Sequence, residues 1–258
     1  MSSQPRSVVW SFGGGTQSVA IAVLVAQGRL PKPARVVMAD TGREASATWE
    51  YLHNHVQPLL SLVGLTIEIV RNESGLPSMY GPSNKPLIPA WTADGAQLRT
   101  FCSGEWKRDV ILRHLRSCGY GPSSPVQMWL GISLDEMHRA RPGQRKWAQH
   151  HWPLLTDCPM SRGDCRAVIA EAGLPMAPKS SCWMCPYRRD EQWQDLRDNY
   201  PQDWQQALDI DAEIRENDAR GILSLHRSGV PLAEVTLVSE ARLPLLVAAG
   251  CDTGMCWV

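Results

Sequence analysis

The sequence predicts an α/β fold, with a Rossmann-like, mostly parallel sheet and a smaller C-terminal helical part. The first observation is the order of the opening segments: an apolar run at residues 8–10, a glycine turn, and an apolar stretch with helical spacing at residues 19–26. The second is that this alternation continues, because strand-like runs at 34–42 and 66–70 enclose a helix-like segment at 44–64. Strand–helix–strand–helix–strand order is typical of a parallel sheet.

The rest of the chain is less regular. Residues 72–98 are rich in Gly, Pro, Ser and Asn and predict a long loop, of the kind that often serves as a lid. Further elements are predicted as a helix at 102–119, a strand at 125–133, a short helix at 163–173 and charged helices at 190–217. We divide the chain into a nucleotide-binding α/β domain, residues 1–175, and a C-terminal helical region with metal-binding cysteines, residues 176–258.

Composition narrows the function classes. Of the 258 residues 43% are hydrophobic, and no segment approaches the roughly 20 apolar residues that cross a membrane. The first residues, MSSQPRSV, contain no apolar signal core, so we expect a cytoplasmic protein without a membrane partner. Lys plus Arg equals Asp plus Glu at 26 each, which removes the whole-protein charge argument for nucleic acid. One basic stretch, residues 138–151, is either a polynucleotide contact or a solvated loop.

The segment SFGGGTQS, residues 11–18, predicts a phosphate site. Adjacent glycines let backbone N–H groups approach a ligand closely, and the helix that follows presents its positive end to an anion. The predicted ligand-binding residues are Ser11, Gly13, Gly14, Gly15, Thr16, Gln17 and Ser18. The alternative is an ordinary strand-to-helix turn in which glycine serves geometry alone.

Polar residues also follow two other predicted strands. Ligands of open parallel sheets bind at the carboxyl ends of the strands. Asp40 and Thr41 follow the second strand and are expected to reach a ribose or an adenine, or else to cap the next helix. Glu136, Arg139 and Arg141 follow the strand at 125–133, where guanidinium groups suit phosphate or sulfate, or else lie solvated at the surface.

Several of these segments resemble one known family. SFGGGTQS resembles the PP-loop, the S-G-G-x-D-S pyrophosphate-binding motif of the adenine nucleotide alpha-hydrolase-like superfamily. ADTGREASATWEYL is similar to the D-T-G-x-E-x-x-x-T-x-x-Y region of phosphoadenosine phosphosulfate (PAPS) reductases. LGISLDEMHRAR resembles their G-x-R-x-x-E-S-x-x-R segment, HWPLLTD the tyrosine-proline-leucine stretch after it, and SCWMCPYR the C-x-x-C-P of iron–sulfur members.

These matches run in family order from about residue 8 to about residue 190. The resemblance implies a sheet of the PP-loop type, an adenine nucleotide ligand (ATP or a PAPS/APS-like sulfonucleotide) and sulfur chemistry. The relatives it suggests are PAPS-reductase-like proteins of phages and the sulfur-insertion proteins of DNA phosphorothioation.

The chain departs from the family pattern at three places. Aligned on Ser18, the first serine of the PP-loop falls on Gly13, and its aspartate, which places a metal such as magnesium or the pyrophosphate, falls on Gln17. The arginine of G-x-R is Ser133. The catalytic cysteine tail of the reductases is not recognisable in GCDTGMCWV, which favours sulfur transfer over reduction.

Cysteine placement predicts a metal centre. Cys182 and Cys185 form a C-x-x-C pair, which by itself is compatible with zinc, an iron–sulfur cluster or a redox dithiol. The family resemblance favours a 4Fe–4S cluster, and we assign Cys102, Cys182, Cys185 and Cys256 as its ligands, with Cys251 as the alternative fourth ligand. We expect the other three cysteines, Cys118, Cys158 and Cys165, to be structural.

Two basic residues flank Cys102. Arg99 and Lys107 resemble the Arg…Cys…Lys cluster that lies near the substrate anion in sulfonucleotide reductases. That resemblance gives Lys107 a catalytic role together with Glu136 and Arg139. The alternative is that Lys107 lies on the solvated face of a helix.

The expected function is an iron–sulfur, nucleotide-binding enzyme acting in sulfur transfer or sulfonucleotide reduction. It would need a protein that donates sulfur or electrons, and nucleic acid is a candidate sulfur acceptor; a homo-oligomer is compatible with the sequence. The alternative, which Gln17 favours, is a non-catalytic nucleotide sensor or regulatory protein with a structural metal, either zinc or a cluster.

Overall fold

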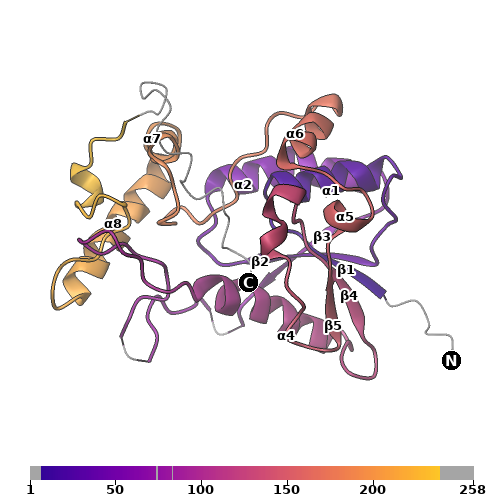
Figure 1. Cartoon of the computed structure of the whole chain (residues 1–258), viewed down its shortest axis with the longest axis horizontal. Coiled ribbons are helices and arrows are strands. Elements are labelled where there is room, and N and C mark those ends of the chain that lie inside the picture. The colour runs from indigo at the N-terminus through magenta and orange to yellow at the C-terminus, as the bar shows by residue number, and fades with distance from the viewer. Residues whose placement is uncertain (1–6, 74, 83, 239–258) are drawn as a thin grey trace.

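The computed structural model describes residues 7–73, 75–82 and 84–238, and its centre is one parallel sheet (Figure 1). Five strands lie in the order β3-β2-β1-β4-β5, and every neighbouring pair is parallel. The strands are β1 (Ser7–Ser11), β2 (Arg35–Asp40), β3 (Ile67–Arg71), β4 (Val126–Trp129) and β5 (Ala148–His151). The predicted α/β class with a mostly parallel, Rossmann-like sheet is confirmed.

Helices connect the strands and extend the chain beyond the sheet. The first half contains α1 (Thr16–Ala26), α2 (Ser46–Tyr51), η1 (Leu52–Val56), α3 (Gln57–Ser61), η2 (Gly104–Arg108) and α4 (Asp109–Ser117). The second half contains η3 (Leu134–Arg139), α5 (Pro153–Thr156), α6 (Arg162–Glu171), α7 (Asp190–Asn199), α8 (Pro201–Asn217) and η4 (Leu232–Glu234). Among the described residues, no helix is both long and apolar enough to cross a membrane.

Successive residues of the central strands serve two different cores, because side chains alternate across a sheet. Trp10 and Val36 pack with α1, α3 and α6, whereas Val9 and Val37 pack with α4 on the opposite face. In Figure 1, α1, α5 and α6 lie above the sheet and α4 lies below it. Helix α1 is buried from Thr16 to Val25, because it lies between the sheet and α6, and this explains why its apolar residues are not confined to one side.

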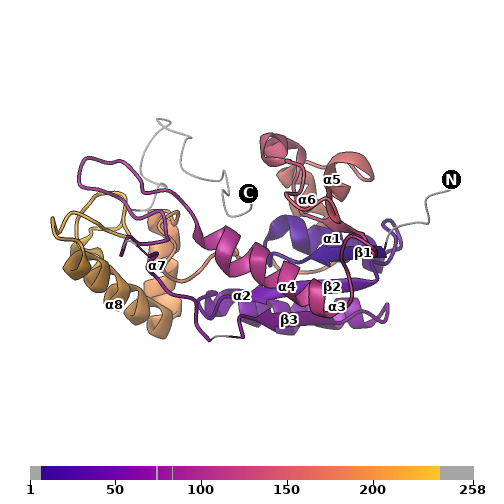
Figure 2. The ribbon, with the colours of Figure 1, turned by 90° about the horizontal axis from the view of Figure 1, so that it is seen from below.

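A third core holds the helical part together. Trp193, Ala207 and Ile214 of α7 and α8 pack with Ile88 and Ala90 from the irregular stretch before η2. A backbone bridge between Trp91 and Ser224 joins these distant parts of the chain. Figure 2 shows the α7–α8 pair beside the sheet rather than on either of its faces. The helical C-terminal part is therefore confirmed, while the division at residues 175 and 176 stays a prediction.

One strand was not predicted. β5 has the sequence AQHH, without alternating apolar residues, and lies inside the basic stretch 138–151. It is held by parallel pairing with β4 at the sheet edge, where one side of the strand has no neighbour among the described strands. This tertiary pairing overrides the weak local preference of the segment.

Candidate functional site

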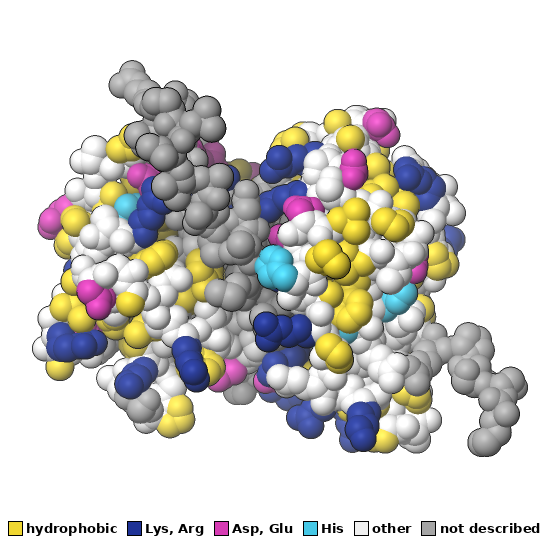
Figure 3. Space-filling model, in the orientation of Figure 1, with side chains coloured by type: hydrophobic (Ala, Val, Ile, Leu, Met, Phe, Trp, Pro, Cys, Tyr) yellow, Lys and Arg dark blue, Asp and Glu magenta, His cyan; other side chains and the backbone are white. Residues whose placement is uncertain are grey.

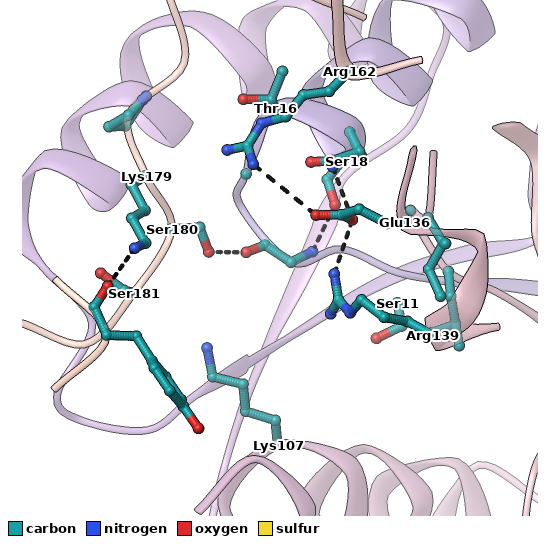
Figure 4. Close-up of a pocket in the computed structure, with 18 of the residues that line it drawn as sticks. Ser11, Thr16, Ser18, Lys107, Glu136, Arg139, Arg162, Lys179, Ser180 and Ser181 are labelled. Carbon is teal, nitrogen blue, oxygen red and sulfur yellow. Dashed lines mark hydrogen bonds and ion pairs between the residues drawn. The ribbon is translucent and has the colours of Figure 1, made fainter. Parts of the chain in front are cut away.

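A cavity of about 130 Å³ opens where β1 and β4 end side by side (Figure 4). The strand order reverses between these strands, since the chain runs outward to β3 on one side and to β5 on the other. Such a reversal leaves a crevice at the carboxyl ends of the strands, the usual ligand position in open α/β sheets. The described residues that line it, here called the switch-point cavity, include Ser11, Gly13, Gly15, Thr16, Gln17, Ser18, Lys107, Gly131, Glu136, Arg139, Arg162, Lys179, Ser180, Ser181, Cys185 and Tyr187.

The glycine loop forms the floor of this cavity. Gly14 has φ +75°, and a Cβ there would lie 2.8 Å from the Thr48 methyl group, so the position requires glycine. The Gly13 N–H donates to Ser18 Oγ at 3.0 Å, and Ser180 Oγ donates to the Gly13 carbonyl. Gly15 caps α1 without a side-chain hydrogen bond. The first-turn N–H groups of α1 therefore remain available to an anion in the cavity.

Gly131, just after β4, allows the two strand ends to approach each other. A Cβ on Gly131 would lie 3.2 Å from both the Ser18 nitrogen and Gln17 Cβ. Any larger side chain would push the loop after β4 away from the start of α1. The narrow cavity between them therefore depends on this glycine.

Glu136 and its cationic neighbours form one wall of the switch-point cavity. Glu136 Oε2 accepts from Arg139 NH1 at 2.8 Å and from Gln17 Nε2 at 3.0 Å, and Glu136 Oε1 lies 4.0 Å from Arg162 NH1. Burial raises the pKa of Glu136, although Arg139 and Arg162 act in the opposite direction. The Gln17 amide also donates to Ser133 Oγ at 3.2 Å. Gln17 thus ties α1 to η3.

Two lysines also line the cavity, one from η2 and one from the segment before the C-x-x-C pair. Lys179 Nζ donates to the Tyr187 carbonyl at 2.7 Å and to Gln192 Oε1 at 3.1 Å. Lys107 Nζ lies 2.5 Å from Glu44 Oε1, and the Glu44 side chain is fully buried. Together with the two arginines, four cations line the cavity, and Glu136 is the one carboxylate among the described lining residues. Figure 3 shows Lys and Arg gathered along the edge of the α/β part that faces the helical part. The cavity is suited to an anion.

Three cysteines line a second, smaller space of about 30 Å³, here called the cysteine cavity. Cys102, Cys182 and Cys185 meet there, and the buried Trp106 lines the same space. The described residues that line both this cavity and the switch-point cavity include Lys107, Ser181, Cys185 and Tyr187, so the two share a wall. The structure brings these three predicted ligands to one space, and their role as ligands stays a prediction.

Backbone contacts fix the C-x-x-C turn. Cys182 pairs with Glu44 in an antiparallel bridge, and the Trp183 N–H donates to the Arg43 carbonyl at 2.9 Å. Arg188 donates to the Cys182 carbonyl at 3.1 and 3.3 Å. Burial lowers the pKa of both Arg43 and Arg188, while the nearby Cys182 opposes that shift. Two arginines therefore lie beside the C-x-x-C turn.

Three of the four predicted cluster ligands, Cys102, Cys182 and Cys185, lie in the described part of the chain. Within the described part of the chain, no three His, Cys, Asp or Glu side chains are arranged to hold one metal ion. Cys256, the predicted fourth ligand, and Cys251, its alternative, lie outside the described residues.

Some predicted residues lie elsewhere. Asp40 does not line the switch-point cavity: its carboxylate accepts from Arg71 Nε at 2.6 Å and from the Gly42 N–H at 2.7 Å. Thr41 Oγ1 lies 3.8 Å from Cys182 Sγ, on the side of the cysteine turn. Arg99 is exposed and lines neither cavity, and Arg141 belongs to a different one.

The sequence did not single out Gly131, Arg162, Lys179, Ser180 or Tyr187 as ligand-binding residues. A local signal existed for two of them, because Lys179 and Ser180 immediately precede the C-x-x-C segment and follow a proline. Arg162 starts α6 and reaches the cavity only through the packing of that helix on α1.

The remaining described cysteines lie apart from this site. Cys165 is buried in the core between α1 and α6, and burial raises the pKa of its thiol to about 12. Cys118 lies at the end of α4, where its sulfur is 3.3 Å from Arg35 NH1, and Cys158 packs against the α1 core. These positions agree with a structural role.

The chain matches no protein-family model and no curated protein. Among solved structures, it is similar to phosphoadenylyl-sulfate (PAPS) reductase from Candida auris, determined as a phosphate complex. The identity is 12%, the match covers 70% of this chain and 83% of that one, and the TM-score is 0.44.

Proposed function

We propose that this protein is an iron–sulfur, nucleotide-binding enzyme that acts in sulfur transfer or in reduction of a PAPS/APS-like sulfonucleotide. The observation that carries the proposal is the wall that the switch-point cavity shares with the cysteine cavity, formed by Lys107, Ser181, Cys185 and Tyr187. An anion in the first cavity would lie beside thiols in the second. Few reaction classes other than sulfur chemistry require that proximity.

The chain's own residues divide the work of binding. The N–H groups of the glycine loop and the start of α1 would hold a phosphate, and Arg139 and Arg162 would neutralise its charge. Lys107 lines both cavities, so it would stabilise negative charge on the group that faces the cysteines. Glu44 orients the Lys107 ammonium from its buried side.

Cys102, Cys182 and Cys185 would hold the 4Fe–4S cluster together with Cys256 or Cys251. When bound, such a cluster would supply an electrophilic iron–sulfur surface next to the anionic sulfur group of the substrate. Trp106 and Trp183, both buried, would exclude water from that surface. A protein donating electrons or sulfur is part of the proposal, and nucleic acid is the candidate acceptor for sulfur transfer.

One observation favours the second candidate, a nucleotide sensor without turnover. Gln17 stands where the PP-loop motif has an aspartate, and its amide is already bonded to Glu136 and Ser133. A neutral amide lacks the negative charge of an aspartate, so Gln17 would hold magnesium on a pyrophosphate more weakly. A protein that binds ATP but neither adenylylates nor reduces a substrate would have this arrangement.

The decisive experiment measures iron, acid-labile sulfide and zinc in protein purified without oxygen, with a visible absorption spectrum. About four irons and four sulfides per chain support the cluster. Cys102→Ser, Cys182→Ser and Cys185→Ser should each lower iron content, whereas the matched Cys165→Ser should not. One zinc and no iron would overturn the iron–sulfur proposal.

Substrate assays then separate the two candidate functions. ATP, APS and PAPS are titrated by calorimetry and incubated with a dithiol reductant, with sulfite and AMP or adenosine bisphosphate as the products measured. Turnover of a sulfonucleotide supports the reductase branch, and sulfur incorporation into DNA from a persulfide donor supports transfer. Binding of ATP without any product would favour the sensor.

A further inference from the structure

A third cavity lies on the other side of β4, on the face covered by α4. Its volume is about 230 Å³, and Leu112, Met128 and Ile132 form an apolar floor. The arginines that line it are Arg108, Arg139, Arg141 and Arg145. We call it the arginine cavity. It meets the switch-point cavity at Arg139, Leu130 and Ile132, which line both.

The charge of this cavity is unbalanced. No Asp or Glu is among the described residues that line it. Arg108 is paired with Asp109 at 2.8 Å and Arg139 with Glu136 at 2.8 Å, but Arg141 and Arg145 form no ion pair within the described residues. His150, which also lines the cavity and is half-buried, has a pKa that burial lowers. The cavity thus contains two exposed arginines without an ion pair among the described residues, Arg141 and Arg145, and two whose charge a carboxylate neutralises, Arg108 and Arg139.

The loop that carries Arg141 and Arg145 is anchored. The Arg141 carbonyl accepts from His150 Nδ1–H at 2.9 Å, and the Arg145 carbonyl accepts from the Ala148 N–H at 2.9 Å. Between them, Gly143 lies so close to β5 that a Cβ would be 2.5 Å from the Ala148 carbonyl oxygen. Both arginines therefore project from a backbone fixed against β5, which lowers the entropic cost of binding a ligand.

The side chain of Arg139 gives a second observation, besides the unbalanced charge, that favours an anion in this cavity. Its side chain is only 9% exposed, and its buried Nε–H finds no acceptor among the described residues. A buried donor without an acceptor is costly, and native structures rarely leave one unpaired. An oxyanion in this region would satisfy it.

We propose that the arginine cavity is a second anion-binding site, which takes the phosphate of an organic phosphate ester. Arg141 and Arg145 hold the phosphate oxygens at the mouth, and the apolar floor accepts the organic part. The ester is either a nucleoside monophosphate or one unit of a single-stranded nucleic acid. The site shares Arg139 with the switch-point cavity, but Arg141 and Arg145, which would hold the phosphate, line only the arginine cavity.

The test compares two double variants with the same loss of charge. Arg141→Gln/Arg145→Gln removes the two unpaired arginines, and Lys146→Gln/Arg166→Gln removes two exposed cations that do not line the cavity. The full chain and both variants are titrated by calorimetry with thymidine 5′-monophosphate, with thymidine and with a short single-stranded thymidine oligonucleotide at fixed salt. Circular dichroism and urea unfolding confirm that both variants fold.

We expect the first variant to lose at least about tenfold in affinity for the phosphate ligands, and the second to stay within about twofold, because a charge-assisted hydrogen bond outweighs long-range attraction. Thymidine, which lacks phosphate, should bind far more weakly than its monophosphate. Oligonucleotide affinity more than about tenfold above that of the monophosphate assigns nucleic acid as the ligand, and similar affinities assign the small ester. Equal losses in the two variants, or no loss in either, would overturn the second site. Failure of sulfonucleotide turnover would leave this result unaffected.

Discussion

Gly14→Ala should destabilise the folded protein more than the addition of one methyl group suggests. The residue has φ +75°, where a non-glycine residue costs about 1–2 kcal/mol. The new Cβ would also lie 2.8 Å from the Thr48 methyl group and 3.3 Å from Ser180 Oγ. Overpacking of this kind adds about 1–3 kcal/mol. We therefore expect a loss of about 2–5 kcal/mol in the free energy of unfolding, unless the loop rearranges and loses anion affinity instead.

Substitutions at two other glycines separate the backbone cost from the steric cost in this prediction. Gly28 has φ +71° with nothing within 4 Å of a Cβ, so Gly28→Ala reports the backbone cost alone. Gly15→Ala adds a Cβ at an ordinary φ and 3.5 Å from Ser180 Cβ, and should change stability little. The measurements are urea unfolding followed by circular dichroism, and calorimetric titration with inorganic phosphate.

Thr48→Ser tests the steric part directly, because it deletes the methyl group that the new Cβ meets. Alone it should cost about 1 kcal/mol for the lost buried methyl. Combined with Gly14→Ala it should recover stability, so the double variant deviates from additivity by about 1–3 kcal/mol. Additive effects, within about 0.5 kcal/mol, would refute the contact between Gly14 and Thr48 as the cause.

Four further predictions concern Glu136, Cys165 and Gly131. Glu136→Gln should tighten binding of inorganic phosphate about tenfold, since it removes the anion that occupies the two neighbouring arginines, and weaker binding would contradict this. Burial raises the pKa of Glu136 in the folded state. The contribution of Glu136 to stability is therefore fully present below its unfolded pKa of about 4, and it is lost as the pH rises through the folded pKa. Urea unfolding of the wild-type protein and of Glu136→Gln across this pH range should show a pH dependence in the wild type that the variant lacks. Cys165, with a thiol pKa of about 12, should resist iodoacetamide at about pH 8 until urea unfolds the chain, as read by peptide mass spectrometry. Gly131→Ala should reduce phosphate affinity, whereas Gly173→Ala, whose Cβ would meet nothing within 4 Å, should not.

The sequence predicted those parts of the site that depend on local order. A strand, a glycine turn and a helix place this loop at a strand end whatever the rest of the chain does. In the structure the predicted residues that line the switch-point cavity are Ser11, Gly13, Gly15, Thr16, Gln17 and Ser18, whereas Gly14 does not line it. Glu136 and Arg139 were predictable for the same reason, because they follow β4. The grouping of Cys102 with Cys182 and Cys185 depended on the need of a C-x-x-C pair for further ligands, because a long stretch of chain that includes β4, β5 and α6 separates these residues.

The contacts of Asp40 could not be predicted from the order of elements along the chain. It ends β2, as predicted, but the register of β2 on β3 places it opposite Arg71, and the two side chains pair at 2.6 Å. A carboxylate that looks available in the sequence is thus already bound to a neighbouring strand. Arg162 is the opposite case, because only the packing of α6 against α1 brings it to Glu136. Both outcomes depend on pairing between elements, which no local pattern encodes.

The segment from Lys179 to Cys185 explains why the two cavities share a wall. At one end Ser180 donates to the Gly13 carbonyl, which ties it to the loop after β1. At the other end Cys182 pairs with Glu44, which ties it to the loop after β2. β1 and β2 are neighbours in the sheet, so these ties hold the segment between the glycine loop and the loop after β2. Because both ties lead to loops that directly follow neighbouring strands, we expect a ligand in the switch-point cavity to reach the cysteines without a domain closure.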